Sequence, residues 1–583
     1  MLQKFSRLKG CILVAAIFFG GWLIRSGSTP RRPADAPKPA FQLQDVTREM
    51  GITFRYKDPV LDPQIQAKMR LIFLGSGVAV ADFNGDGWMD ILLVSAGRDE
   101  KNHLYLNQHG NGFKEVAEEW GIADTNRAGA TVTPVVFDYD NDGRPDVYLA
   151  RLGCSMLFHN LGDHFENVSK SSGLGDCLSS AGAVPIDYDG DGLIYLYVLR
   201  YWKPLNYFAL PVPTPRIWLD GLGTSRNGGD NTLYRNQGDG TFKNVTPVAG
   251  GSDTGWSLDG GAADVRGDGL QRLYISNDFG PDSFWTAKDR KLIDSWSRSF
   301  PSVDRRSGMG VSFGDLAHDG RPHIHVSNEN SRYYEPELGN YLFKFSGTDD
   351  LATESAYAWG TSKCGTFNWG SAFADFDLDG SEDLFVTNGF ISGDPKAGDY
   401  EYHLMSSMSS STDLIRMPDL KRMNLKGHDH SCMFWNREGH FENVAEAVGL
   451  VESWDGRAAG MIDFDNNGSM DLIVTTQNGP PHLLRNTVKP GKRWIELSLV
   501  GTRSNRDGTG AVIELRQPGQ RPQYRWATGG KSGLMASSDP RIHFGLPVEA
   551  DVDIMVRWPS GMTDHLNHLA PGQIHLLKEG GSP

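Results

Sequence analysis

The chain has 583 residues, a formal net charge of −15, and 69 glycines and 30 prolines. This length exceeds what one compact core accommodates, and the many turn residues favour short strands over long helices. The acidic balance argues against a nucleic-acid partner, because phosphate backbones attract basic surfaces.

The first 40 residues are predicted to be a targeting segment. Three basic residues precede an apolar run over residues 11–24, which is the pattern of a secretory signal peptide. The run is shorter than the roughly 20 residues of a membrane-spanning helix. We therefore predict a signal peptide over residues 1–28, with an uncleaved N-terminal membrane anchor as the alternative. Residues 29–40 are proline-rich and are predicted to form an extended linker.

Export makes the cysteines informative, because disulfides persist in oxidising compartments. Removal of the leader leaves Cys154, Cys177, Cys364 and Cys432. Nearness in sequence predicts one bridge between Cys154 and Cys177 and another between Cys364 and Cys432. Four reduced, buried thiols are the alternative. The protein is expected to be secreted, periplasmic or on the cell surface.

An aspartate-rich motif recurs along the chain, with Asp or Asn at its first, third, fifth and ninth positions and Gly at the sixth. Complete copies begin at Asp82, Asp138, Asp375 and Asp463, and a further copy from Asp187 ends in Tyr195 instead of a carboxylate. The predicted metal ligands of these five loops are Asp82, Asn84, Asp86, Trp88 and Asp90; Asp138, Asp140, Asp142, Arg144 and Asp146; Asp187, Asp189 and Asp191; Asp375, Asp377, Asp379, Ser381 and Asp383; and Asp463, Asp465, Asn467, Ser469 and Asp471.

The spacing of the motif fits calcium, which prefers six to eight oxygen ligands. Alternate side chains of a tight loop converge on one ion, the glycine permits the sharp turn, and the seventh residue supplies its backbone carbonyl. An EF-hand begins in the same way but has Glu at position twelve and helices on both sides. Position twelve is here Leu93, Leu149, Val386 or Val474. We therefore exclude EF-hands and predict about four to five structural calcium ions.

Two further copies have lost ligand positions. The fourth loop has Arg266 and Arg272 where ligands are expected, and the fifth has Ala317 and His323. We predict that a salt bridge replaces the ion in the fourth loop.

Short apolar runs flank each loop and predict a hairpin of two strands. A third run ending in Asn and a fourth with an apolar-x-x-Val spacing follow most loops. Four short strands per unit, repeated seven times, predict a seven-bladed β-propeller over residues 41–488. The last unit lacks a fourth strand, and the segment from Leu43 to Gly51 has its spacing. We predict that this segment completes the last blade and closes the ring.

These repeats resemble the FG-GAP/VCBS repeats of integrin-like propellers. The C-terminal region resembles the ASPIC/UnbV domain in Ser504-Asn505-Arg506-x-Gly508-x-Gly510-Ala511, His543-Phe544-Gly545-Leu546 and Trp558-Pro559-Ser560-Gly561. The combination is similar to the cartilage acidic protein family and its bacterial relatives, and it implies a calcium-binding propeller followed by a small β domain. The departures at Tyr195, Arg266, Arg272, Ala317 and His323 argue against calcium in the fourth and fifth loops and weaken it in the third.

Residues 489–583 are also predicted to be all-β from their own pattern. Runs at 494–500, 512–515 and 552–556 are separated by Gly and Pro turns, as in a sandwich or barrel. The pattern of this domain contains no recognisable site.

Two insertions bear on function. Residues 200–230 carry Tyr201, Trp202, Tyr207, Phe208 and Trp218, which either stack on a sugar or partner or pack the insertion onto the blades. The insertion over 390–430 contains His428 and His430, which we interpret as a polar loop rather than a transition-metal site.

The sequence contains no zinc-protease helix, no phosphate-binding loop and no dinucleotide-binding fingerprint. We therefore expect a binding module that recognises an extracellular protein or glycan, tethered to a membrane if the leader is retained. The alternative is a polysaccharide-acting enzyme, which would need two carboxylates outside the metal loops, about 5–9 Å apart in a cleft.

Overall fold

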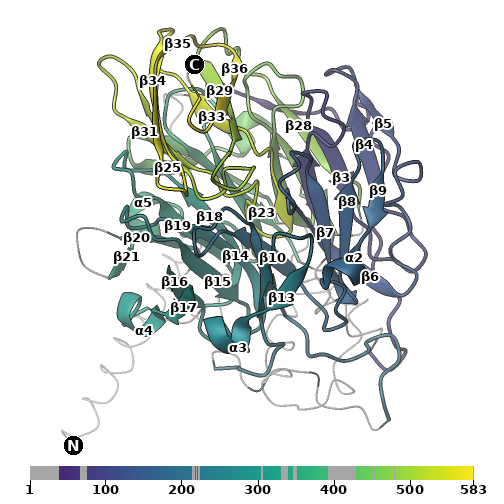
Figure 1. The fold of residues 1–583 in the computed structure, drawn as a ribbon. Helices are drawn as coiled ribbons and strands as arrows, with labels where there is room; N and C mark the ends of the chain where they lie inside the picture. The colour runs from purple at the N-terminus through teal and green to yellow at the C-terminus, as the bar shows by residue number, and fades with distance from the viewer. Residues whose placement is uncertain are drawn as a thin grey trace, which may run out of the picture. The chain divides into compact units, whose positions relative to one another are not determined.

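A computed structural model describes residues 38–581 except 66–74, 213–216, 218–219, 221–223, 304–305, 330–338, 346–350, 391–428, 452 and 478. Residues 40–583 form one compact unit. The predicted signal peptide and nearly all of the predicted linker lie outside the described residues. Strands dominate the described part of the chain (Figure 1), which confirms the all-β prediction.

In the described residues, seven antiparallel sets of four strands, here called blades 1 to 7, make up the N-terminal part of this unit, and the sheet of blade 1 has one additional strand. Blades 1 to 3 contain β2 (Val78–Ala81), β3 (Asp90–Leu93), β4 (His103–Asn107) and β5 (Phe113–Glu115); β6 (Gly129–Phe137), β7 (Asp146–Gly153), β8 (Met156–Asn160) and β9 (Phe165–Asn167); and β10 (Gly182–Ile186), β11 (Tyr195–Leu199), β12 (Thr232–Asn236) and β13 (Phe242–Asn244). Blades 4 and 5 contain β14 (Ser257–Ala263), β15 (Arg272–Asn277), β16 (Ser283–Lys288) and β17 (Lys291–Asp294); and β18 (Gly308–Gly314), β19 (His323–Asn328), β20 (Tyr341–Phe345) and β21 (Ala352–Glu354). Blades 6 and 7 contain β22 (Asn368–Ala374), β23 (Asp383–Asn388), β24 (Cys432–Arg437) and β25 (His440–Asn443); and β26 (Gly456–Ile462), β27 (Asp471–Thr476), β28 (His482–Asn486) and β1 (Leu43–Asp45).

One-turn helices follow the fourth strand in several blades: α2 (Ser169–Ser172), α3 (Thr246–Ala249), α4 (Trp296–Ser299), α5 (Ala356–Trp359) and η4 (Glu446–Val448).

The blades form a closed ring. The first strands of successive blades contact each other in chain order, and β26 of blade 7 contacts β2 of blade 1. The N-terminal strand β1 pairs with β28, with Leu43 opposite Asn486 and Asp45 opposite Leu484. This confirms the prediction that the N-terminal segment supplies the missing strand of the last blade.

The C-terminal region forms two further sheets, and its expected strands are present. One sheet has the order β33-β29-β36 and the other β31-β30-β34-β35. The strands are β29 (Trp494–Val500), β30 (Val512–Arg516), β31 (Gln523–Trp526), β33 (Ile542–Gly545), β34 (Val552–Arg557), β35 (Thr563–Leu569) and β36 (Ile574–Lys578). Their inward side chains, including Ile495, Ile513 and Val556, form one buried core.

A segment of the C-terminal domain, residues 528–540, enters the ring, and we call it the axial loop. Its short strand β32 (Ala536–Ser537) pairs in parallel with β2 at Val78 and Ala79. Gly533 N donates to Val311 O at 3.1 Å, and Asp539 N donates to Met461 O at 2.9 Å. The loop therefore hydrogen-bonds blades 1, 5 and 7 at once.

The axial loop also carries a buried ion pair and an apolar anchor. Lys531 Nζ lies 2.5 Å from Asp259 Oδ1 of blade 4, and both side chains are buried. Leu534 is fully buried in the largest apolar cluster of the molecule. Burial of a charged group is costly unless its partner is present. The axial loop must therefore keep Lys531 next to Asp259 when it lies in the ring.

Both predicted disulfides are present, Cys154–Cys177 and Cys364–Cys432. The alternative of four reduced thiols is wrong. Of the aromatic residues in the insertion near residue 200, Tyr201, Trp202 and Tyr207 are buried in the largest apolar cluster, and Phe208 packs against it. Those four therefore pack the insertion onto the blades, whereas Trp218 lies outside the described residues.

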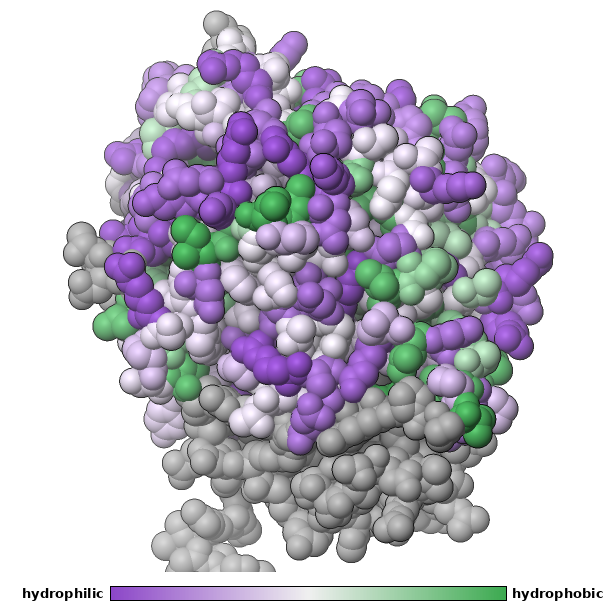
Figure 2. Space-filling view, turned by 60° about the horizontal axis from the view of Figure 1, so that its bottom comes forward, coloured by the Kyte–Doolittle hydropathy of each residue, from purple (hydrophilic) through white to green (hydrophobic). Residues whose placement is uncertain are grey.

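Most of the insertion over 390–430, including His428, also lies outside the described residues, while Asp429 accepts a hydrogen bond from Thr366 N. Within the described part of the chain, no helix is long and apolar enough to span a bilayer. One face of the surface is largely hydrophilic, with hydrophobic residues in scattered small groups (Figure 2), as is usual for a folded chain.

Candidate metal-binding loops

Each complete loop is shaped by its first aspartate. Asp82 accepts hydrogen bonds from the backbone N–H groups of Asp86 at 3.0 Å and Gly87 at 2.8 Å. The same two bonds recur from the fifth and sixth residues to Asp138, Asp375 and Asp463. The sixth residue has a positive φ, +85° at Gly87, which glycine adopts at little cost. The motif therefore folds into one turn because its first side chain binds the turn's own backbone.

The fifth and seventh residues are also linked. The N–H of the seventh residue donates to the fifth side chain: Trp88 to Asp86, Arg144 to Asp142, Ser381 to Asp379 and Ser469 to Asn467. In the second loop the Arg144 guanidinium additionally contacts Asp142. The carbonyls of these residues remain the predicted ligands.

The ninth aspartate also has a structural role, which its position in the motif did not indicate. Asp90 accepts hydrogen bonds from Phe83 N at 2.9 Å and from Asn107 N at 2.8 Å. Asp146 and Asp383 make the equivalent pairs of bonds. This carboxylate thus joins its loop to the third strand of its blade.

The asparagine that ends the third strand links neighbouring blades. Asn107 Nδ2 donates to Met89 O of its own blade at 3.0 Å and to Phe464 O of blade 7 at 2.7 Å. The corresponding asparagines of blades 2, 3 and 7 also reach the loop of the preceding blade. The repeated Asn was visible in the sequence, but its partner lies in another repeat.

The carboxylates of four of the five predicted loops converge as a cation site requires, whereas the first loop, with Asn84 at its third position, forms no such cluster among the described residues. In the second, third, sixth and seventh loops at least three acidic side chains place an oxygen within 4.8 Å of one another. Asp377 Oδ1 and Asp465 Oδ1, both at the third loop position, are shielded from solvent and accept no hydrogen bond from a described residue. A buried carboxylate oxygen without a donor is costly, and a cation held by the loop would satisfy it. The residues present therefore fit a hard divalent cation with oxygen ligands.

The electrostatics point the same way. Burial, reinforced by neighbouring carboxylates, raises the pKa of Asp90 and of Asp138 to about 8. Burial likewise raises the pKa of Asp463 to about 7 and of Asp377 to about 6. Without a bound cation, these groups resist ionisation because their negative charges are crowded and desolvated.

The third loop differs, as its sequence predicted. The Tyr195 hydroxyl donates to Asp191 in place of a ninth carboxylate. Arg235 and Arg290 both approach Asp189 Oδ2 to 3.5 Å. The third loop thus has fewer carboxylates and two protein cations beside them.

In the fourth and fifth loops the protein supplies the positive charge. Arg272 lies 2.6 Å from Asp268 and 3.8 Å from Asp264, which confirms the predicted salt bridge in the fourth loop. In the fifth loop Lys344 lies 2.8 Å from Asp319.

The C-terminal domain contacts the candidate metal-binding loops directly. Asp507 Oδ2 accepts a hydrogen bond from Asp138 N at 2.9 Å in the second loop. At the seventh loop, Arg541 donates to Asp463 O at 3.1 Å and to Asn466 Oδ1 at 2.7 Å. The contacts come from residues far apart in the sequence, so no local pattern announced them.

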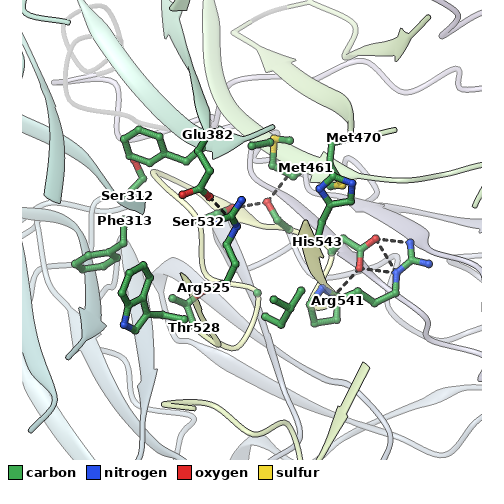
Figure 3. A pocket seen from close by; sticks show the side chains of 18 of the residues that line it. Ser312, Phe313, Glu382, Met461, Met470, Arg525, Thr528, Ser532, Arg541 and His543 are labelled. Atoms are coloured by element: carbon green, nitrogen blue, oxygen red, sulfur yellow. Dashed lines mark hydrogen bonds and ion pairs between the residues drawn. The ribbon is translucent and has the colours of Figure 1, made fainter. Parts of the chain in front are cut away.

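A cavity of about 150 Å³ lies between blades 5 to 7 and the C-terminal domain (Figure 3). Most charged residues that line it form ion pairs. Arg525 Nε lies 3.2 Å from Glu382 Oε1, and Arg541 Nε donates hydrogen bonds to both carboxylate oxygens of Asp539. Asp375, the first residue of the sixth loop, also reaches the cavity wall. These carboxylates are therefore engaged in ion pairs or in the loop.

Profiles of known families match two parts of the chain. Residues 82–149 match the FG-GAP-like repeat, and residues 501–583 match the ASPIC and UnbV domain. Cartilage acidic protein 1 of Xenopus tropicalis is 23% identical over 548 residues, which cover 88% of this chain and 74% of that protein. Its human counterpart is 22% identical over 539 residues, covering 87% and 72%.

Among solved structures, the chain is similar to an Agrocybe aegerita lectin that recognises non-reducing terminal N-acetylglucosamine, with a TM-score of 0.36, 14% identity, and coverage of 65% of this chain and 85% of that one. The six-bladed propeller lectin of Aleuria aurantia gives a TM-score of 0.31, 14% identity, and coverage of 54% and 88%. The chain therefore contains an FG-GAP-like repeat and an ASPIC/UnbV domain and is similar over most of its length to cartilage acidic protein 1.

Proposed function

We propose that this protein is an exported, calcium-stabilised propeller that acts as a recognition module for a protein or glycan. The observation that carries the calcium assignment is the convergence of carboxylates in the second, sixth and seventh loops, with Asp377 Oδ1 and Asp465 Oδ1 accepting no hydrogen bond from a described residue; the first loop is included because it has the same sequence motif. Calcium supplies the missing positive charge and binds oxygen ligands of this kind.

The proposed sites are the loops of blades 1, 2, 6 and 7. Each has four acidic or amide side chains at alternating positions, whereas the third loop ends in Tyr195 and faces Arg235 and Arg290. In the fourth and fifth loops Arg272 and Lys344 already pair with the aspartates. We therefore propose about four ions per chain, at the lower end of the number expected from the sequence.

The role of calcium is proposed to be structural rather than catalytic. The first and ninth carboxylates bind backbone N–H groups of their own blade, and the side chains at the third and fifth positions supply further oxygens. This leaves little coordination for a substrate. In the cavity of Figure 3, Arg525 pairs with Glu382 and Arg541 pairs with Asp539, and no observation on the described residues favours the enzymatic alternative.

Export is supported by the two disulfides, which persist outside reducing compartments. The relatives named for cartilage are consistent with an extracellular location. The test of recognition is a glycan array together with a pull-down from extracellular material, each with and without calcium. We expect a specific ligand that is retained in calcium. Turnover of a polysaccharide, abolished by a loop variant that stays folded, would replace this proposal with the enzymatic one.

A further inference from the structure

The C-terminal domain brings carboxylates as well as guanidinium groups to loops that are already acidic. Asp507 accepts a hydrogen bond from the backbone of the second loop at Asp138 N, and Arg506, the residue before it, lies beside Gly143 of the same loop. At the seventh loop, Glu496 of β29 is fully buried; its Oε2 is in ion-pair contact with Arg541, and its Oε1 accepts no hydrogen bond from a described residue. The domain thus places carboxylates beside two of the loops proposed to hold calcium.

The positive charge available at the seventh loop is smaller than the negative charge. Arg541 lies 3.0 Å from Glu496 Oε2 and donates to Asp463 O. Its Nε also donates to both carboxylate oxygens of Asp539. Arg485 Nε lies 3.8 Å from Asp465 Oδ2. Among the described residues, two guanidinium groups therefore face five carboxylates: Asp463, Asp465, Asp471, Glu496 and Asp539.

Without a cation, these buried carboxylates either repel one another when ionised or must be held protonated, and both raise the energy of the docked state. A divalent cation in the loop reverses the sign of this interaction. We infer that calcium in the second and seventh loops controls docking of the C-terminal domain, and with it the seating of the axial loop in the ring. This inference rests on the proposed calcium binding.

The axial loop provides a direct readout of docking. The amides of Gly533 and Asp539 donate to propeller carbonyls, so they exchange with solvent only when the loop leaves its place. Strand β15 of blade 4 follows a loop whose charge is balanced by Arg272, and it provides an internal reference. Hydrogen exchange of the full chain, in calcium and after chelation, compares the two segments.

We expect chelation to speed exchange of the axial loop at least about tenfold while β15 changes little. Unchanged exchange of the axial loop, in a protein shown by dialysis to bind calcium, would overturn the inference and leave the calcium assignment intact. Equal acceleration of β15 would also overturn it, because docking would then be no more calcium-dependent than the whole fold. Absence of bound calcium would instead remove the proposed function.

Charge-neutral variants separate electrostatics from packing. Asp507→Asn keeps an oxygen for Asp138 N, and Glu496→Gln keeps the shape of the side chain. The double variant is expected to match the natural protein in calcium and to retain more axial-loop protection after chelation. Glu549→Gln removes one charge at an exposed position of the same domain and is expected to behave like the natural protein. Loss of protection in calcium by the double variant would indicate a merely structural role and contradict the inference.

Discussion

Deletion of residues 41–52 tests ring closure most severely, because this segment contributes β1 and the turn after it. Its side chains Phe41, Leu43, Val46, Met50 and Ile52 are 1%, 6%, 1%, 4% and 5% exposed. Burial of an apolar side chain of this size contributes about 1.5–3 kcal/mol, so their loss costs roughly 7–15 kcal/mol. This equals the entire stability of about 5–15 kcal/mol typical of a folded domain.

The expected result is a chain that no longer forms a cooperative native state, because β28 is left with an unpaired edge. Urea unfolding followed by tryptophan fluorescence measures the effect. Deletion of residues 29–40 is the matched control and is expected to leave the unfolding midpoint nearly unchanged. Equal midpoints for the two deletions would refute the closure argument.

Two further predictions concern the loops. Gly468 and Gly87 share a φ of +85°, but an added Cβ collides with the Trp494 ring only at Gly468, so Gly468→Ala should lose about 1–3 kcal/mol more stability than Gly87→Ala in urea unfolding. Similar losses for both would argue against tight docking of the domain. The raised pKa values of Asp90 and Asp138 add stability that is fully present below pH 4 and is lost as the pH rises toward 8. The melting temperature of the metal-free protein should therefore decrease as the pH rises from 5 to 8.5, and calcium should reduce that decrease. Identical pH profiles with and without calcium would contradict the claim that these loops crowd negative charge.

Local repeats made much of the fold predictable. A hairpin around each loop depends on neighbouring residues, so the pattern alone located β2, β3 and their counterparts. Closure of the ring by β1 was predictable because the last repeat lacks the residue spacing of a fourth strand, and the segment from Leu43 to Gly51 has that spacing. The salt bridge of Arg272 followed from the replacement of a ligand by a cation.

The docking of the C-terminal domain was not predictable in this way. Its axial loop is irregular apart from the two residues of β32, and its partners Val78, Val311 and Met461 lie far away in the sequence. The sequence also did not predict whether Tyr201 and Trp202 are buried. A cluster of aromatic residues has the same sequence pattern whether it contacts a ligand or packs in a core.

The most direct test of calcium-stabilised architecture is a count of bound ions. Equilibrium dialysis of the full chain against calcium, followed by elemental analysis, is predicted to give about four ions per chain. With dissociation constants of about 0.1–1 mM, each site should add roughly 0.4–1.4 kcal/mol of stability at 1 mM calcium. Asp377→Asn should lower the count by one, because it weakens the third position of the sixth loop. A protein that binds no calcium, and whose melting curve a chelator leaves unchanged, would contradict the account.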